Sequence, residues 1–342
     1  MASKAEQFRQ RLRRKGRKFR AAPHRFFADS SSGFVRAFGR LLSPLIMRNA
    51  LVLAILEDPQ QAALSRRGVF GWIARVFAAR ASHVRLRRLS DHGNPVVSII
   101  MAALNAESTI SESLDTLIGQ SYCALEIIVI DDGSTDATRD IVRDKMLIEP
   151  RLSLIEGGPM EGAAMARNRG LKAAKGIYVG FQDADDRSHP ERIERQLDAL
   201  VGTEAMVVVC NACRQTPDGQ QIRINGRLFS RSFISMLFVR QPVVDRIGYL
   251  RRMVVGEDAE YHARLVATFG RDKQRYLFQT LYWAQFQPDS LLFSHGITKV
   301  DEAGEVTYEQ HADLQQDLAV AIEQVDEMSR GDRDPYVGFD LS

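Results

Sequence analysis

The sequence predicts an α/β domain with a doubly wound, mostly parallel sheet. Continuous apolar runs, such as residues 96–101, are typical of strands that are buried on both faces. Helical patterns of about a dozen residues alternate with these runs, as crossover connections between parallel strands require. The chain has 342 residues, of which 45% are hydrophobic, so it is long enough to bury the core of such a domain.

The alternation of strands and helices begins at Pro95. We expect strands over residues 96–101, 125–130, 152–155 and 177–181. The first helix is expected to begin with Ser108 or Thr109 as its cap and with Glu112 in its first turn. Helices are expected over residues 108–120, 136–149 and 162–174, the last of them after a Gly-rich loop. In such a sheet, ligands bind beyond the carboxyl ends of the strands.

Basic residues are concentrated in the first part of the chain. Residues 1–90 carry 20 Lys and Arg against four acidic residues, although the whole chain has a net charge of only +3. We therefore divide the chain into a basic, largely helical arm (1–94), the α/β domain (95–300) and an acidic C-terminal helix and tail (301–342). Such an arm fits an anionic partner, which can be a membrane surface, a nucleic acid or the acidic part of the protein itself.

An amphipathic helix is expected near the end of the arm, over residues 69–80. Its apolar residues share one face, and Arg75 and Arg80 lie off that face. Such a helix either binds an anionic membrane interface or packs on the domain with its basic face in solvent, and the sequence leaves both open. Nucleic acid is not expected as a partner, because aromatic residues are not interleaved with the basic ones.

The acidic C-terminal helix is expected over about residues 306–328. Its apolar residues recur at helical spacing, at Leu314, Leu318, Ile322 and Val325. We expect this face to dock on the domain, on a second copy of the chain or near the basic arm. Whether the chain forms a homo-oligomer is left open.

Three cysteines, Cys123, Cys210 and Cys213, give no basis for a disulfide framework. Cys210 and Cys213 lie in an apolar run and no second CxxC completes a zinc site, so we expect them to be core residues. No apolar stretch reaches the roughly 20 residues of a membrane span, and no cleavable leader is recognisable. We expect a cytoplasmic protein that lies on the inner face of the cell membrane.

Acidic residues follow the expected strands at the edge where ligands bind. They form three groups, Asp131-Asp132, Asp183-Ala184-Asp185-Asp186 and Glu257-Asp258. Neighbouring carboxylates repel one another unless a cation or hydrogen-bond donors compensate them. Their oxygens suit Mg²⁺ or Mn²⁺, which can bridge them to ligand phosphates. The chain has neither GxGxxG after its first strand nor GxxxxGK[ST], which argues against a dinucleotide oxidoreductase and a P-loop NTPase.

Five motifs, in this order and spacing, give the chain a family resemblance. They are SIIMAALNAE (98–107), EIIVIDDGSTD (126–136), ARNRG (166–170), FQDADD (181–186) and GED (256–258). From Val96 to about His295 the sequence resembles the inverting family-2 glycosyltransferases of the GT-A fold. The resemblance implies a nucleotide-sugar donor, Mn²⁺ or Mg²⁺ as cofactor, and a glycan or lipid-linked acceptor. A fainter likeness over residues 18–30 is to a short N-terminal motif of bacterial capsule and surface-polysaccharide proteins.

The resemblance also implies which residues bind the donor. The nucleotide sugar would be bound by Ala102, Leu104, Glu107, Asp132, Arg167, Asp183 and Ala184, and the metal by Asp185. Ala102 and Leu104 would line the base pocket, and Asp132 would hydrogen-bond the base, expected to be uracil. Arg167 would lie near the diphosphate or the base, and Asp183 would bind the ribose or the sugar.

Each of these assignments has a structural alternative. Asp132 can be read as a turn residue, and Arg167 as a solvated arginine on a helix. Asp183 and Asp185 can be read as an acidic turn that leads into the next helix. Asp186 is left out of the expected metal ligands, because it can serve the turn instead.

The chemistry of glycosyl transfer implies a base. The acceptor hydroxyl loses a proton as it attacks, and the metal neutralises the charge that develops on the leaving diphosphate. By resemblance the base is Asp258, with Glu257 orienting it or contacting the acceptor. Alternatively, both are acids at a helix start, where the macrodipole favours them. Arg264 on the same helix is expected to form a structural ion pair.

The sequence departs from the family pattern in three places. Pro and Tyr are usual where Ala102 and Leu104 stand, so stacking on the base is expected to be weaker. Gln287 stands where many members have a His, and His295 is either a substitute metal ligand or a structural residue. The chain has no QxxRW, so a processive, membrane-embedded polymer synthase is not expected.

We therefore expect an inverting glycosyltransferase that acts in bacterial surface-polysaccharide synthesis. A nucleotidyltransferase shares the metal–carboxylate chemistry, but it would need a basic Gly-rich loop directly after the first strand, and residues 102–107 provide none. An inactive, membrane-associated scaffold of the same fold is the third candidate. The sequence does not specify the donor sugar, the acceptor or the linkage.

Overall fold

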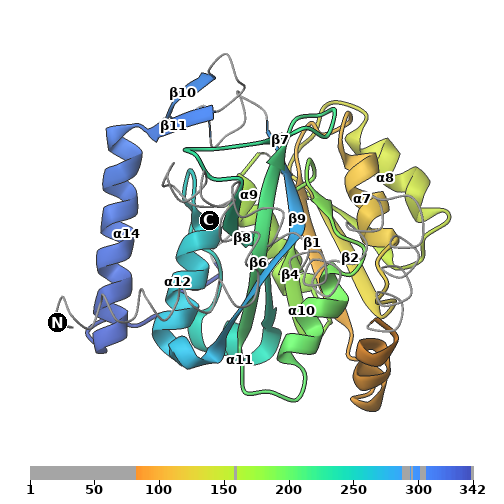
Figure 1. The fold of residues 1–342 in the computed structure, drawn as a ribbon, viewed down its shortest axis with the longest axis horizontal. Helices are drawn as coiled ribbons and strands as arrows, with labels where there is room; N and C mark the ends of the chain where they lie inside the picture. The colour runs from red at the N-terminus through yellow and green to blue at the C-terminus, as the bar shows by residue number, and fades with distance from the viewer. Residues whose placement is uncertain (1–81, 158–159, 287–292, 294–295, 301–305, 340–342) are drawn as a thin grey trace, which may run out of the picture.

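A nine-stranded sheet forms the centre of the molecule (Figure 1). The computed structural model describes residues 82–157, 160–286, 293, 296–300 and 306–339. The strands follow the order β3-β2-β1-β4-β8-β6-β9-β5, and β7 pairs with β6. The four strands predicted from the apolar runs are confirmed and parallel: β1 (Val97–Ala103), β2 (Leu125–Asp131), β3 (Leu152–Glu156) and β4 (Tyr178–Phe181).

The residues of β1 point alternately to the two faces of the sheet. Ile99 belongs to the core cluster that contains Leu114, whereas Ile100 belongs to the cluster on the other face that contains Leu171. Because the strand carries apolar side chains on both faces of the sheet, helices must cover both faces. Otherwise one row of apolar side chains would be exposed to solvent. The covering helices are α7 (Ile110–Ile118), α8 (Thr138–Met146) and α9 (Ala163–Ala173).

The starts of two helices differ from the prediction. Thr109 is the residue before α7, as expected, but its side chain makes no capping bond, and its hydroxyl lies 3.4 Å from the Ala106 carbonyl. Glu112 lies in the first turn as predicted, but the predicted side-chain cap is wrong. Helix α8 is shorter than predicted, because the Asp136 carboxylate accepts the N–H of Thr138 at 3.0 Å and the helix begins there.

The other half of the sheet joins the first through antiparallel pairing of β4 with β8. Strand β6 is antiparallel to β8 and parallel to β9, so the sheet as a whole is mixed. The strands are β5 (Arg187–Ser188), β6 (Val207–Gln215), β7 (Gln221–Ile222), β8 (Phe229–Val239) and β9 (Gln274–Gln285). The helices of this half are α10 (Arg192–Leu200), α11 (Arg240–Ile247), α12 (Glu257–Phe269) and a 3₁₀ turn, Arg271–Lys273.

The cysteines have the environment that the sequence predicts. Cys210 and Cys213 lie fully buried in β6, and Cys123 is exposed. All three thiols are free. The CxxC pair is therefore part of the core.

The last part of the basic arm packs on the domain. Residues 82–91 form a helix, and Leu89 of this helix is fully buried in the core. Arg85 forms ion pairs with Glu191 at 2.6 Å and with Glu194 at 2.5 Å, both next to or within α10. These contacts join the end of the arm to the sheet through α10.

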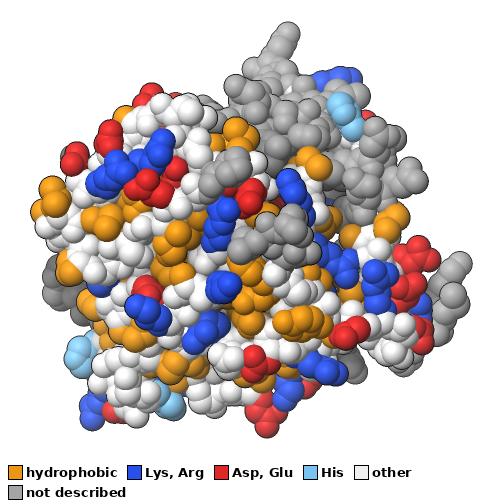
Figure 2. All heavy atoms as spheres, turned by 180° about the vertical axis from the view of Figure 1, so that it is seen from behind, with side chains coloured by type: hydrophobic (Ala, Val, Ile, Leu, Met, Phe, Trp, Pro, Cys, Tyr) orange, Lys and Arg blue, Asp and Glu red, His pale blue; other side chains and the backbone are white. Residues whose placement is uncertain are grey.

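The remainder of the arm, including the helix predicted over residues 69–80, lies outside the described residues. Within the described part of the chain, no helix combines the length and the apolar character needed to cross a membrane. Figure 2 shows the face behind that of Figure 1, where acidic, basic and apolar side chains are interspersed.

A hairpin precedes the C-terminal helix. Strands β10 (Gly296–Val300) and β11 (Val306–Gln310) pair in antiparallel register, and α14 (Ala312–Arg330) follows and lies alongside α12 (Figure 1). The prediction of a helix from Val306 onward is therefore wrong in its first residues. The N–H of Val306 donates instead to the Arg223 carbonyl at 2.9 Å, and β-branched and aromatic residues favour the extended conformation here.

Helix α14 buries a face that includes the predicted, half-buried Val325 but not Ile322. Ala321 is 8% exposed and Met328 is 7% exposed, whereas Ile322 is 56% exposed. Placing Ile322 on the docking face was therefore wrong, because the buried positions are one residue out of phase with it. The side chains of Leu314 and Leu318 lie outside the described part of the chain.

The tail after α14 returns to the domain. The N–H of Val337 donates to the Ile247 carbonyl at 3.0 Å, and the Val337 carbonyl accepts the N–H of Tyr249 at 2.9 Å. Gly248 lies between these two partners with φ +69. A Cβ atom at this position would stand 1.9 Å from the Val337 carbonyl oxygen, so only glycine fits.

We expect Gly248→Ala to lower the free energy of unfolding by about 2 kcal/mol or more, because the methyl group and the tail cannot occupy the same space. Urea unfolding followed by circular dichroism measures the loss. Gly162→Ala is the matched control, since Gly162 has φ +94 but open space around the added Cβ. Equal losses in the two variants would show that the contact with Val337 contributes nothing.

Candidate active site

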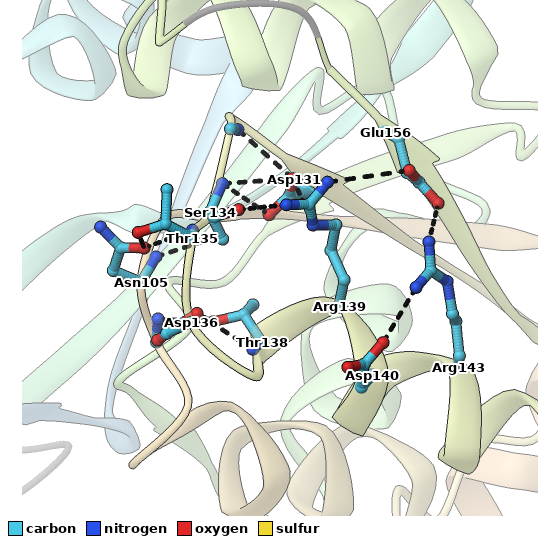
Figure 3. A network of polar contacts seen from close by, with 12 residues as sticks. Asn105, Asp131, Ser134, Thr135, Asp136, Thr138, Arg139, Asp140, Arg143 and Glu156 are labelled. Atoms are coloured by element: carbon cyan, nitrogen blue, oxygen red, sulfur yellow. Dashed lines mark hydrogen bonds and ion pairs between the residues drawn. The ribbon is translucent and has the colours of Figure 1, made fainter.

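The Asp131 carboxylate holds the turn after β2 (Figure 3). It accepts the N–H of Ser134 at 3.2 Å and lies 3.6 Å from the Arg139 guanidinium. Asn105, after β1, has φ +48, and its side-chain oxygen accepts the N–H of Thr135 at 2.9 Å. These bonds fix the two strand ends against each other, so Asp131 serves the turn.

Glu107 adds to the connection between the two loops. Its carboxylate accepts the N–H of Ala137 at 3.0 Å, and its own N–H donates to Asp136 at 3.0 Å. A carboxylate at the start of α8 is also favoured by the helix dipole. Ala102 is half-buried and Leu104 is 37% exposed, so both border the carboxyl edge of β1. Glu107 thus has a local structural role, and its part in donor binding stays a prediction.

Asp132 is bonded to the start of α9. It is 3% exposed, and its carboxylate accepts the N–H of Gly162 at 2.7 Å and that of Glu161 at 3.1 Å. Asp132 is therefore not merely a turn residue, because these bonds fix the start of the helix that carries Arg167. A base-binding role for Asp132 stays a prediction.

Arg167 is buried between two carboxylates from different parts of the chain. It is 4% exposed, and it donates to Asp183 at 2.6 Å and to Glu257. Burial alone would lower the pKa of Arg167, but Asp183, Glu257 and Asp258 together raise it above its usual value. The alternative reading of a solvated helix arginine is therefore wrong, because the side chain joins the loop after β4 to the start of α12.

Three aspartates after β4, here called the acidic triplet, lie close together. Carboxylate oxygens of Asp183, Asp185 and Asp186 are all within 4.8 Å of one another. Burial, and then the charge of Asp183, raise the pKa of Asp185 to about 6. Burial and the charge of Asp185 also raise the pKa of Asp186 well above its usual value. These shifts mean that the protein itself compensates the negative charges of Asp185 and Asp186 poorly, whereas Asp183 is paired with Arg167.

The donor set of the acidic triplet fits a divalent cation. Its hard carboxylate oxygens are the ligands that Mg²⁺ and Mn²⁺ prefer, and a cation would relieve their mutual repulsion. Asp186 belongs to the cluster, although the sequence analysis left it out, and one of its oxygens accepts the N–H of Gln285 at 2.9 Å. Ala184 is 7% exposed and its methyl group packs in the core, which leaves only its backbone to face a ligand. Gln287 and His295 lie outside the described residues.

Glu257 and Asp258 begin helix α12, directly after Gly256, which has φ +89. Glu257 is buried and paired with Arg167. Asp258 is half-buried, and one oxygen accepts the N–H of Ala259 at 2.8 Å. Burial, and then the charge of Glu257, raise the pKa of Asp258 to about 6. Glu257 and Asp258 are thus acidic residues at a helix start, as the structural alternative requires. They also place the Asp258 carboxylate, whose pKa is raised, next to the ion pairs of Arg167 with Asp183 and Glu257, here called the Arg167 bridge.

Arg264, further along α12, has the structural role that was expected. It is fully buried and pairs with Glu260 at 3.0 Å. It also donates to the carbonyls of Tyr249 at 2.7 Å and Pro335 at 3.1 Å. The helix that carries Asp258 is therefore bonded both to the loop after α11 and to the C-terminal tail.

Sequence reasoning missed three residues around the acidic triplet. The Tyr282 hydroxyl accepts the N–H of Asp183 at 3.1 Å. Arg214 donates to the Gln285 carbonyl at 3.3 Å, and the N–H of Gln285 donates to the acidic triplet. Tyr282 and Gln285 each lie 99 positions from their acidic partners, and the pairing of β9 with β5, directly after the acidic triplet, brings them there. No local motif could have indicated them.

Comparison with known proteins identifies the domain. Residues 98–253 match the family model described as Glycosyl transferase family 2. The UDP-Glc:alpha-D-GlcNAc-diphosphoundecaprenol beta-1,3-glucosyltransferase WfaP of Escherichia coli is 41% identical over 102 residues, which is 30% of this chain and 40% of that protein. The succinoglycan biosynthesis protein ExoO of Rhizobium meliloti (strain 1021) is 32% identical over 130 residues, 38% of this chain and 37% of that protein. The chain spans about a third to a half of the length of such relatives.

A solved structure shares the fold. The S. aureus TarS fragment 1–349, in complex with UDP-GlcNAc, superposes with a TM-score of 0.51 at 19% sequence identity, over 69% of this chain and 71% of that one. The parallel half-sheet, the acidic strand ends and the family match agree with one another. The chain thus carries a glycosyltransferase family 2 domain with the GT-A fold.

Proposed function

We propose that the protein is an inverting glycosyltransferase that moves a sugar from a UDP-sugar to a glycan or lipid-linked acceptor in bacterial surface-polysaccharide synthesis. The observation that carries the proposal is the Arg167 bridge, which brings a carboxylate of the acidic triplet and the start of α12 to one place. The names of WfaP and ExoO support the choice of donor and pathway class, since they specify UDP-Glc and succinoglycan biosynthesis for those proteins.

On the donor side, Asp132, Ala102 and Leu104 would hold the uracil base, with Glu107 fixing the loop beside them. Asp183 and the Ala184 backbone would bind the ribose or the sugar. Asp185 would hold Mn²⁺ or Mg²⁺, and the cation supplies positive charge that offsets the charge on the leaving diphosphate.

On the acceptor side, Asp258 takes the proton of the acceptor hydroxyl as that oxygen attacks the anomeric carbon. The bond between this carbon and the diphosphate oxygen breaks on the opposite face, so the configuration inverts and UDP leaves. A raised pKa suits this role, because a base with a pKa nearer to neutrality binds the proton more strongly in the transition state. Glu257 and Arg167 position Asp258 relative to the donor.

We further propose that the protein lies on the inner, cytoplasmic face of the cell membrane. The 20 basic residues within positions 1–90 support this location, because each Lys or Arg near an anionic surface adds about 1 kcal/mol of attraction. Co-sedimentation with vesicles that contain phosphatidylglycerol, compared with neutral vesicles, tests it. Equal partition between the two vesicle types would contradict a membrane role for the arm.

One activity screen distinguishes the proposed function from two other candidate functions. A nucleotidyltransferase would release diphosphate from a nucleoside triphosphate, and an inactive scaffold would turn over no nucleotide at all. We expect instead that nucleotide sugars are hydrolysed or transferred in the presence of Mn²⁺ and not in its absence. A panel of UDP-, GDP- and dTDP-sugars, with nucleoside triphosphates alongside, makes the comparison.

Calorimetry of UDP with Mn²⁺ tests the donor site. We expect the wild-type protein to bind UDP with a metal-dependent heat, and Asp185→Ala to lose that heat because a cation ligand is removed. Asp218→Ala, at an exposed turn, is the control and should behave as the wild type. Metal-dependent binding that survives in Asp185→Ala would exclude this residue as the ligand.

The base is tested by Asp258→Asn. We expect turnover to fall by about 10²–10⁴-fold, because the amide cannot accept the hydroxyl proton, while the affinity for UDP with Mn²⁺ stays unchanged. In the wild type, the rate should fall as the pH drops through about 6, where Asp258 becomes protonated. A variant with the full wild-type rate would refute the role of Asp258 as base.

The same substitution should stabilise the fold at neutral pH. Burial and the charge of Glu257 raise the pKa of Asp258 in the folded protein, so the ionisation of Asp258 above pH 6 destabilises the folded state. This destabilisation is absent below about pH 4, the pKa of an aspartate in the unfolded chain, because the carboxyl is then protonated in both states. In metal-free buffer at pH 7.5, Asp258→Asn should exceed the wild type by about 1–2 kcal/mol in unfolding free energy. The difference should shrink between pH 6 and 4. A constant difference across this range would mean that the ionisation of Asp258 is not its cause.

A further inference from the structure

We propose that a pocket beside the acidic triplet binds the acceptor, and that the acceptor carries a phosphate or diphosphate group next to its sugar. The inference rests on the proposed function, since it names the second substrate of the same site. It concerns a part of the molecule that the family match covers only in part, because two of the lining residues, Phe293 and Tyr308, lie beyond residue 253.

The pocket has a volume of about 420 Å³. Its lining comes from the end of β6 with β7, from the turn that leads into β8, and from Phe293 together with Tyr308 of β11. The turn and the hairpin are joined at Asn225, whose side chain donates to the Tyr308 carbonyl at 2.9 Å and accepts the N–H of Tyr308 at 2.8 Å. The walls include Arg214, Ile222, Arg227, Leu228, Phe293 and Tyr308.

The pocket adjoins the acidic triplet through one residue. Arg214, in its wall, donates to the carbonyl of Gln285 at 3.3 Å. The N–H of the same Gln285 donates to Asp186 at 2.9 Å. An acceptor in this pocket would thus lie next to the residues proposed to hold the donor, as transfer between two bound substrates requires.

The charge of the pocket favours an anionic group. Arg214 and Arg227 both line it, and among the described residues neither forms an ion pair with a carboxylate. The Arg214 guanidinium stands over the Phe293 ring, 4.9 Å from its centre, which keeps it in place without neutralising it. The charge of Arg214 also acts on Asp185 and Asp186, so it is shared with the acidic triplet. Arg227 has no acidic partner among the described residues, and guanidinium groups are suited to phosphate oxygens, which accept paired N–H bonds.

The rest of the lining is apolar and aromatic. The rings of Phe293 and Tyr308 lie 5.1 Å apart and nearly perpendicular, and Phe293 is 2% exposed. Ile222 and Leu228 continue this surface. Such walls suit the apolar face of a sugar ring or the first part of an alkyl chain. A sugar diphosphate linked to a lipid combines all three chemical features, and a soluble sugar phosphate combines two.

The anionic group in this pocket belongs to the acceptor and not to the donor. The donor diphosphate is assigned to the cation held by Asp185, and its base to the ends of β1 and β2. The pocket is lined from β6, β7 and β11, and in the sheet the strands β4 and β8 separate β6 from β1 and β2. A substitution at its rim should therefore affect the two substrates differently.

The experiment uses the full chain saturated with UDP and Mn²⁺. Calorimetry compares three probes: undecyl α-GlcNAc diphosphate, α-GlcNAc diphosphate without the alkyl chain, and neutral undecyl α-GlcNAc. We expect both diphosphate probes to bind at least about tenfold more tightly than the neutral one, since charge-assisted hydrogen bonds are the stronger kind. A further gain for the alkylated diphosphate identifies a lipid-linked acceptor, and equal binding of the two identifies a soluble one.

Arg227→Ala should weaken the diphosphate probes by about tenfold and leave UDP affinity unchanged. Arg227 is exposed, so the variant should fold, and Arg246→Ala, an exposed arginine on α11, is the matched control. Equal binding of neutral and diphosphate probes, or a loss of UDP affinity in Arg227→Ala, would overturn the inference. Failure of the wild type to bind UDP with Mn²⁺ would instead overturn the proposed function, so the two failures are distinguishable.

Discussion

The site depends on a buried arginine held by carboxylates from two distant segments. A guanidinium in the interior costs several kcal/mol unless it is paired and hydrogen-bonded, and removing one partner leaves an uncompensated charge. Arg167 is 4% exposed, and Asp183 and Glu257 compensate it from the loop after β4 and from the start of α12. The helix that carries Arg167 is itself fixed by Asp132, which bonds its first turn. The relative position of donor-side and acceptor-side residues thus follows from one desolvated ion-pair network.

The same edge of the sheet concentrates negative charge that the fold does not neutralise. Burial raises the pKa of both Asp185 and Asp258 to about 6, and it also raises the pKa of Asp186 well above its usual value. A chain selected for stability alone would replace such carboxylates, since each ionised group opposes folding at neutral pH. These carboxylates at the carboxyl ends of the strands lower the stability of the fold, as residues of functional sites commonly do, because their charge is needed for binding or catalysis.

The sequence specified the half of the fold in which interactions are local or periodic. The four parallel strands followed from apolar runs, and the acidic groups followed from their positions at strand ends, because neither depends on distant partners. The Arg167 bridge and the Gln285 link could not be predicted, since they join residues 90 and 99 positions apart through the pairing of the sheet. Helix α14 was found, but its buried face was assigned wrongly around Ile322, because a short periodic pattern leaves the phase of a helix open.

The contact of the tail with Arg264 has a consequence for biosynthesis. The Pro335 carbonyl, which accepts an N–H of the fully buried Arg264, lies 71 positions further along the chain. While the nascent protein is still on the ribosome, this guanidinium must wait for a partner that has not yet been translated. The helix bearing Asp258 can therefore reach its final packing only after residue 335 has left the ribosome, and a chain released before that point would present a loosely packed helix to cellular proteases.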